Sequence, residues 1–109
     1  MLFSRPVEKE NRAHPRYEVE AEADLSAGAS QSSHPIQNLS LGGICIRTPI
    51  LEEVGQPVDV VLRLPDRELS LSGEVVWVNR TPPQDVGIRW TDLDEDRRGV
   101  LRRYLETVI

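Results

Sequence analysis

The sequence has little of what disulfide scaffolds, secreted proteins and membrane proteins require. Its 109 residues include one cysteine, Cys45, so an internal disulfide is excluded. No apolar run approaches the roughly 18 residues that span a bilayer. The N-terminus also lacks the basic, apolar and cleavage segments of a secretory signal. We therefore expect a cytoplasmic protein that does not insert into a membrane.

Basic residues are also outnumbered, with 13 Lys and Arg against 18 Asp and Glu and a net charge of −5 at pH 7. Nucleic acids and anionic membranes favour a basic protein face, so we expect neither as a partner. A small anionic ligand needs only a local basic patch. The length fits one domain, and 39% apolar with 28% charged residues is an ordinary globular composition.

Short stretches of alternating apolar and polar residues predict six strands separated by turn signals. The predicted strands cover residues 17–25, 34–37, 44–46, 58–64, 69–77 and 86–90. The Ser-, Gly- and Ala-rich residues 26–33 predict a long hairpin loop, and Gly73 predicts a bulge. Six short strands of this kind are typical of a small barrel or sandwich.

Helical periodicity is confined to the C-terminal segment, where a helix is expected over about residues 92–108. The apolar stripe consists of Val100, Leu101, Tyr104, Leu105 and Val108. Thr91, Asp92 and Asp94 are candidate N-caps. The simplest arrangement has this helix plugging or flanking the β-structure.

Two features of the sequence are not explained by strand formation. The first is a pair of arginines just before the first predicted strand. Arg12 and Arg16 are four residues apart and therefore at most roughly 14 Å apart along an extended chain. Each guanidinium offers a planar fork of donors that suits phosphate oxygens or the O6/N7 edge of guanine. Both arginines can therefore grip one small ligand.

The second feature is the polar loop Asn38-Leu39-Ser40-Leu41-Gly42-Gly43. Asn38 and Ser40 supply side-chain hydrogen-bonding groups. The adjacent glycines allow positive φ and a close approach of the backbone to a ligand. Consecutive backbone N–H groups in such a turn can also bind an anion.

Together the two features resemble the signature of the PilZ domain family, Arg-x-x-x-Arg followed by Asp/Asn-x-Ser-x-x-Gly. Further similar stretches are Gly55-x-Pro57-Val58, Gly73-Glu74-Val75-Val76-Trp77 and Val86-Gly87-Ile88-Arg89-Trp90. The resemblance implies a six-stranded antiparallel PilZ-type β-barrel with one C-terminal helix. That domain would cover residues 12–109, behind a flexible N-terminal arm at residues 1–11.

The resemblance implies a non-enzymatic receptor of cyclic diguanylate (cyclic di-GMP), with no cofactor and no metal. Arg12 and Arg16 would grip guanine edges and phosphates, while Asn38, Ser40 and Gly43 would hold a guanine. Many members have Asp at the position of Asn38, so a charged acceptor is replaced by a weaker neutral one. The N-terminal loop would change conformation on binding and signal to a protein of the motility, pilus or polysaccharide machinery.

Other functions are weighed against the same residues. The main alternative is a PilZ-fold protein-interaction module that does not bind the nucleotide. A barrel that binds single-stranded nucleic acid conflicts with the acidic charge, and an enzyme would need a base–nucleophile or metal constellation that the sequence lacks.

Individual residues with reactive side chains have simpler explanations. His14 and His34 fall short of a metal-ligand set, so His14 is expected to position the arginine loop and His34 to cap a turn. Cys45, between two isoleucines, is expected to be a small buried residue and not a nucleophile. Trp77 and Trp90 fit core or barrel-rim positions.

Overall fold

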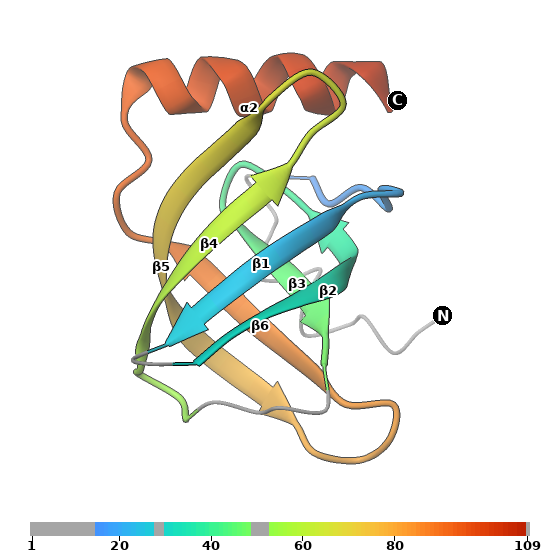
Figure 1. Ribbon diagram of the computed structural model, residues 1–109, viewed down its shortest axis with the longest axis vertical. Coiled ribbons are helices and arrows are strands. Elements are labelled where there is room, and N and C mark those ends of the chain that lie inside the picture. Colours follow the sequence, from blue (N-terminus) through green and yellow to red (C-terminus); the bar gives the residue numbers. More distant parts are fainter. Residues whose placement is uncertain (1–14, 28–29, 49–52, 109) are drawn as a thin grey trace.

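Six strands and one helix make up the computed structural model, which describes residues 15–27, 30–48 and 53–108. The elements are β1 (Glu22–Ala27), β2 (Ser30–Leu39), β3 (Gly43–Arg47), β4 (Pro57–Arg63), β5 (Glu68–Asn79), β6 (Asp85–Trp90) and α2 (Glu95–Thr107). The strands form a closed antiparallel barrel in the order β1-β2-β3-β6-β5-β4 (Figure 1). The predicted fold, a six-stranded antiparallel barrel with a C-terminal helix, is confirmed.

The alternation of side chains explains how the barrel acquires its core. On β4, Val58, Val60 and Leu62 are buried, whereas Asp59 and Arg63 are exposed. Successive strand residues point to opposite faces, so the apolar set fills the barrel interior. Each such side chain contributes about 1.5–3 kcal/mol on burial.

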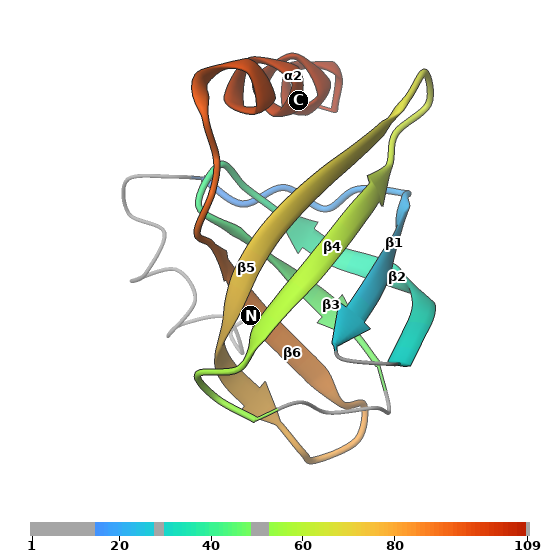
Figure 2. The same cartoon turned by 60° about the vertical axis from the view of Figure 1, so that its left-hand side comes forward.

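Helix α2 lies across one end of the barrel, next to the turn that joins β4 to β5 (Figures 1 and 2). Leu101 and Leu105 are its buried residues. Asp94 is the N-cap among the three candidates, and its side chain accepts a hydrogen bond of 2.8 Å from the backbone N–H of Arg97. Within the part of the chain that the structure describes, no helix has the length and apolar character needed to cross a membrane.

The first strand begins later than the sequence pattern predicts. A strand was expected over residues 17–25, but β1 starts at Glu22. Tyr17 instead forms an isolated bridge with Leu39, through backbone hydrogen bonds of 3.0 and 2.9 Å. The segment before β1 is thereby held against β2.

The predicted long loop over residues 26–33 is wrong. Residues 30–33 belong to β2 and pair with β1, in a register that places Ser26 opposite Gln31 and Asp24 opposite Ser33. Strand pairing uses backbone groups and does not require apolar side chains. The Ser-rich composition therefore gave no sign of this pairing.

The predicted bulge at Gly73 is also misplaced. Gly73 pairs regularly with Trp90, and the register shift lies between Val75 and Trp77. A Cβ atom on Gly73 would lie 2.5 Å from the side chain of Ile88. Glycine at this position is therefore explained by packing and not by a bulge.

Candidate functional site

The two sequence features meet at Arg16 and Asn38, which are 22 positions apart. Arg16 Nη1 donates a hydrogen bond of 2.6 Å to Asn38 Oδ1. The neighbouring bridge between Tyr17 and Leu39 fixes the segment that carries Arg16 beside β2. This contact joins the segment before β1 to the end of β2 through a guanidinium and a neutral amide.

Asn38 belongs to β2 and not to a loop, since β2 continues to Leu39. The turn into β3 is shorter than predicted and consists of residues 40–42. A register shift in the pairing of β2 with β3 lies between Ile36 and Asn38. Such irregularities bend a strand and redirect its side chains, and this one directly precedes the contact with Arg16.

Ser40 is fully buried and organises the turn. Its Oγ accepts hydrogen bonds from the backbone N–H groups of Gly42 at 3.0 Å and Gly43 at 3.1 Å. Its carbonyl oxygen accepts a bond of 3.2 Å from Trp90 Nε1. Ser40 therefore shapes the turn from within, and Trp90 anchors the turn to β6.

Gly43 was expected to allow a positive φ and a close approach of the backbone to a ligand, but it meets a different packing requirement. Its φ lies outside the left-handed region, whereas Gly55 has a φ of +93°. A Cβ atom on Gly43 would collide with the backbone carbonyl oxygen of Ile88. Glycine is therefore required at the start of β3 because β6 passes close to it.

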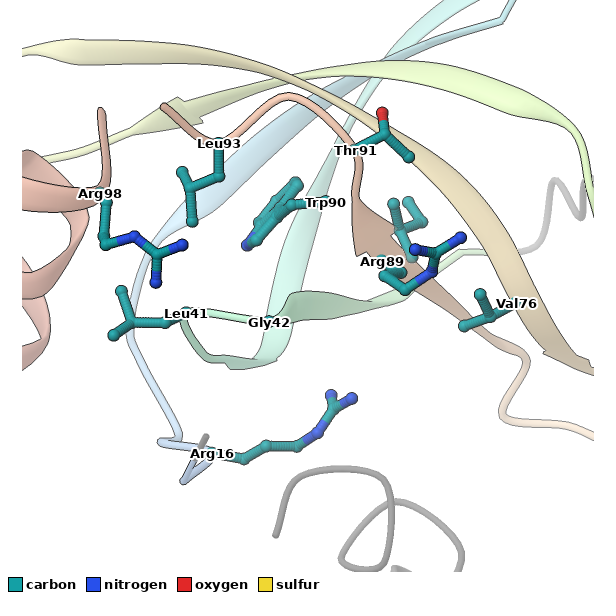
Figure 3. A pocket seen from close by; sticks show the side chains of 10 residues that line it. Arg16, Leu41, Gly42, Val76, Arg89, Trp90, Thr91, Leu93 and Arg98 are labelled. Atoms are coloured by element: carbon teal, nitrogen blue, oxygen red, sulfur yellow. The ribbon is translucent and has the colours of Figure 1, made fainter. Parts of the chain in front are cut away.

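A pocket of about 660 Å³ lies beside this turn, between the barrel and the start of α2 (Figure 3). Its lining residues are Arg16, Leu41, Gly42, Val76, Ile88, Arg89, Trp90, Thr91, Leu93 and Arg98. Among these lining residues, all from the described part of the chain, three are arginines and none is acidic, although the net charge of the chain is −5. The volume is within the roughly 300–1,000 Å³ of small-molecule sites.

The predicted site residues have different positions relative to this pocket. Arg16 lines it, and Asn38 contacts Arg16. Ser40 and Gly43 bound the turn whose Leu41 and Gly42 form part of the wall. Arg12 lies outside the described residues, as does the arm predicted at residues 1–11.

Sequence reasoning missed two of the three arginines that line the pocket. Arg89 projects from β6 and pairs with Glu74 through Nη2 and Oε1 at 2.8 Å, and Arg98 extends from α2. In sequence, Arg89 looks like an ordinary outward residue of a strand and Arg98 like an ordinary helix residue. Trp90, expected at the core or the barrel rim, is buried and lines the pocket.

Cys45 is buried, as predicted. Burial, reinforced by the carboxylate of Asp85, raises the pKa of the thiol to about 12. The thiolate, which is the nucleophilic form, is therefore scarce at neutral pH. The expected burial of Cys45 is confirmed.

The prediction that His34 caps a turn is wrong, because β2 extends through this position. His34 is buried, with Nε2 2.6 Å from Ser32 Oγ and 3.4 Å from Thr48 Oγ1. His14 lies outside the described residues. Across the described ranges, no group of three or more His, Cys, Asp or Glu side chains is placed to hold a metal ion.

The profile of the PilZ domain matches residues 10–107. The chain therefore belongs to the PilZ domain family, whose members are non-enzymatic receptors of cyclic di-GMP. This confirms the family resemblance and the prediction that the chain is not an enzyme. No curated protein matches the chain.

Three solved structures show the same fold. The inhibitor of motility MotI/DgrA of Bacillus subtilis has a TM-score of 0.74 at 14% identity, over 86% of this chain and 49% of that chain. The present chain thus spans about half of that protein's length. The PilZ domain of CeSA from a cellulose-synthesizing bacterium has a TM-score of 0.68 at 17% identity, over 85% and 97%. The PilZ domain of Escherichia coli YcgR, solved with c-di-GMP, has a TM-score of 0.72 at 11% identity, over 87% and 88%.

Proposed function

We propose that this chain is a receptor that binds cyclic di-GMP at the pocket between the 40–42 turn and α2. The observation that carries the proposal is the contact of Arg16 with Asn38 beside a pocket whose described lining residues include three arginines and no acidic side chain. The overall charge of −5 makes this patch a local exception in the chain.

The chemistry of the ligand fits these groups. Cyclic di-GMP carries two phosphates and two guanines, and guanidinium forks pair with phosphate oxygens and with guanine O6 and N7. We assign these contacts to Arg12 and Arg16. Asn38 would contact a guanine edge, and Ser40 and Gly43 would contribute through the turn that they shape.

We further propose how ligand binding is signalled to a partner protein. The domain would comprise residues 12–109, and the loop from Arg12 to Arg16 would change conformation when the ligand binds. The complex would then present a new surface to a partner protein of the motility, pilus or polysaccharide machinery in the cytoplasm. The names of two similar structures, an inhibitor of motility and a domain from a cellulose-synthesizing bacterium, support partners of this kind.

Isothermal titration of the full chain with cyclic di-GMP tests the proposal. We expect saturable binding with a Kd tighter than ~10⁻⁴ M, which corresponds to more than ~5.5 kcal/mol. Cyclic di-AMP is the matched control, because it carries the same phosphates without the guanine edge, and it should bind more weakly. No heat with either ligand would instead favour the PilZ-fold interaction module that does not bind nucleotides.

A further inference from the structure

Arg98 lines the pocket and, unlike its neighbour Arg97, has no carboxylate partner among the described residues. Six arginines have a carboxylate oxygen within 4.0 Å: Arg47, Arg63, Arg67, Arg80, Arg89 and Arg97. Arg98 forms no ion pair with any described residue, although its side chain is half-buried. A partly desolvated guanidinium without a counter-ion is costly, so its environment favours an anion.

The position of Arg98 directs this charge into the pocket. The residue lies near the start of α2, and its guanidinium points toward Trp90 and Leu41 (Figure 3). Arg16 approaches the same pocket from the segment before β1, on another side. An anion between Arg16 and Arg98 would relieve the repulsion between the two like charges and would interact with both.

We infer that Arg98 is a ligand-binding residue that contacts a phosphate of the bound nucleotide and thereby links α2 to the occupied site. The inference rests on the proposed function and adds a residue and an element to it. Arg98 is preferred to Arg89 for this role because Arg89 already pairs with Glu74 at 2.8 Å.

The link has a mechanical consequence for α2. Leu101 and Leu105 hold the helix to the barrel through apolar contacts. A phosphate on Arg98 adds a polar tie nearer the N-terminal end of the helix. Ligand binding should therefore slow amide hydrogen exchange over residues 95–100, the first turns of the helix, which surround this tie.

The test compares the full chain with two arginine variants that differ only in position. Arg98→Ala removes the proposed contact. Arg102→Ala removes the same charge one helical turn further on, from an exposed residue that does not line the pocket. We expect Arg98→Ala to weaken cyclic di-GMP binding about tenfold or more, and Arg102→Ala to change the Kd less than about twofold.

Hydrogen exchange at saturating ligand gives a second measurement that does not depend on affinity. The wild type should gain protection over residues 95–100, and Arg98→Ala should lose this gain while keeping protection around residues 38–43. If the wild type binds but both variants match it, the role of Arg98 is overturned and the proposed function stands. If the wild type does not bind cyclic di-GMP, both fail together.

Discussion

Two arginines connect separate segments of this barrel, and their partners differ in charge. Arg63 on β4 donates to the Asp24 carboxylate on β1 through bonds of 3.2 and 2.8 Å. Arg16 donates to the Asn38 amide at 2.6 Å. The first pair joins two opposite charges, whereas the second joins a guanidinium to a neutral amide. The same residue type therefore joins two strands at one place and lines a pocket at the other.

The comparison explains how an acidic chain can attract an anion. Arginines on the barrel wall, such as Arg47 with Asp85 at 3.0 Å, are compensated by carboxylates. The described residues that line the pocket include three arginines and no acidic side chain. Local arrangement, and not net charge, sets the field that a small ligand meets.

The largest effect is expected from Arg16→Ala. Removing one charged hydrogen-bonding group is worth about 1.5–3 kcal/mol, or roughly 10–100-fold in the Kd for cyclic di-GMP. The thermal midpoint should hardly change, because Arg16 precedes the strands. Calorimetric titration and thermal unfolding measure the two effects.

Arg63→Ala is the matched control, since it removes the compensated arginine. Its Kd for cyclic di-GMP should equal that of the wild type within about twofold, given that Arg63 does not line the pocket. An Arg16→Ala variant that unfolds, or that binds as well as Arg63→Ala, would show that Arg16 is a structural residue.

A smaller effect is expected from Asn38→Asp, which makes the second pair resemble the first. One carboxylate oxygen can accept from Arg16 while the other accepts from a guanine N–H, and charged acceptors are roughly twice as strong as neutral ones. The Kd should tighten by a few-fold. Its salt dependence should become shallower, because the pocket loses one unit of net positive charge. Weakening beyond tenfold would indicate that the amide N–H₂ donates to the ligand.

The smallest effect concerns the compensated pair and appears at low pH. The hydrogen bond from Arg63 lowers the pKa of the Asp24 carboxyl below its ordinary value of 3.8. The stabilisation is therefore complete above that value and is lost as the pH falls through the lowered pKa. Solvent screens the exposed guanidinium of Arg63 even though Asp24 is buried, so Arg63→Ala should reduce urea stability slightly at pH 7 and not at pH 2.

Arg67→Ala serves as the control for this measurement. Arg67 Nε lies 3.7 Å from Oδ2 of the adjacent Asp66, and this contact does not connect two strands. Its stability difference from the wild type should stay near zero at both pH values. A loss for Arg63→Ala that persists at pH 2 would show that the side chain stabilises β4 by packing and not by its charge.

Most of the barrel could be predicted because its strands alternate cleanly. Val58, Val60 and Leu62 on β4 show the period of two that a half-buried strand requires. The hairpin from β1 to β2 could not be predicted, because Ser32 and Ser33 carry no apolar signal and their pairing depends on backbone groups. Whether such a segment forms a strand depends on the strand with which it pairs, and local composition does not reveal that strand.

The candidate site was predictable only where a motif marks it. Arg16 and Asn38 belong to recognisable patterns, and in the structure Arg16 Nη1 lies 2.6 Å from Asn38 Oδ1. Arg98 belongs to no pattern. It reaches the pocket because α2 packs across one end of the barrel, an arrangement set by tertiary contacts (Figure 2). Likewise, the hydrogen bond of Trp90 to the Ser40 carbonyl joins residues 50 positions apart.

The closed order of the sheet limits how this domain can communicate. Each of the six described strands is paired on both sides, including β1 with β4, which completes the ring. Some half-strands nevertheless pair with one described strand only, among them residues 30–35 of β2 with β1, and residues 68–72 of β5 with β4. A strand from another protein could therefore extend the sheet only along such half-strands, and any other contact with a partner would involve side chains, turns or the outer face of α2. Closure of the ring removes the other edges and with them most of the opportunity for edge-to-edge aggregation.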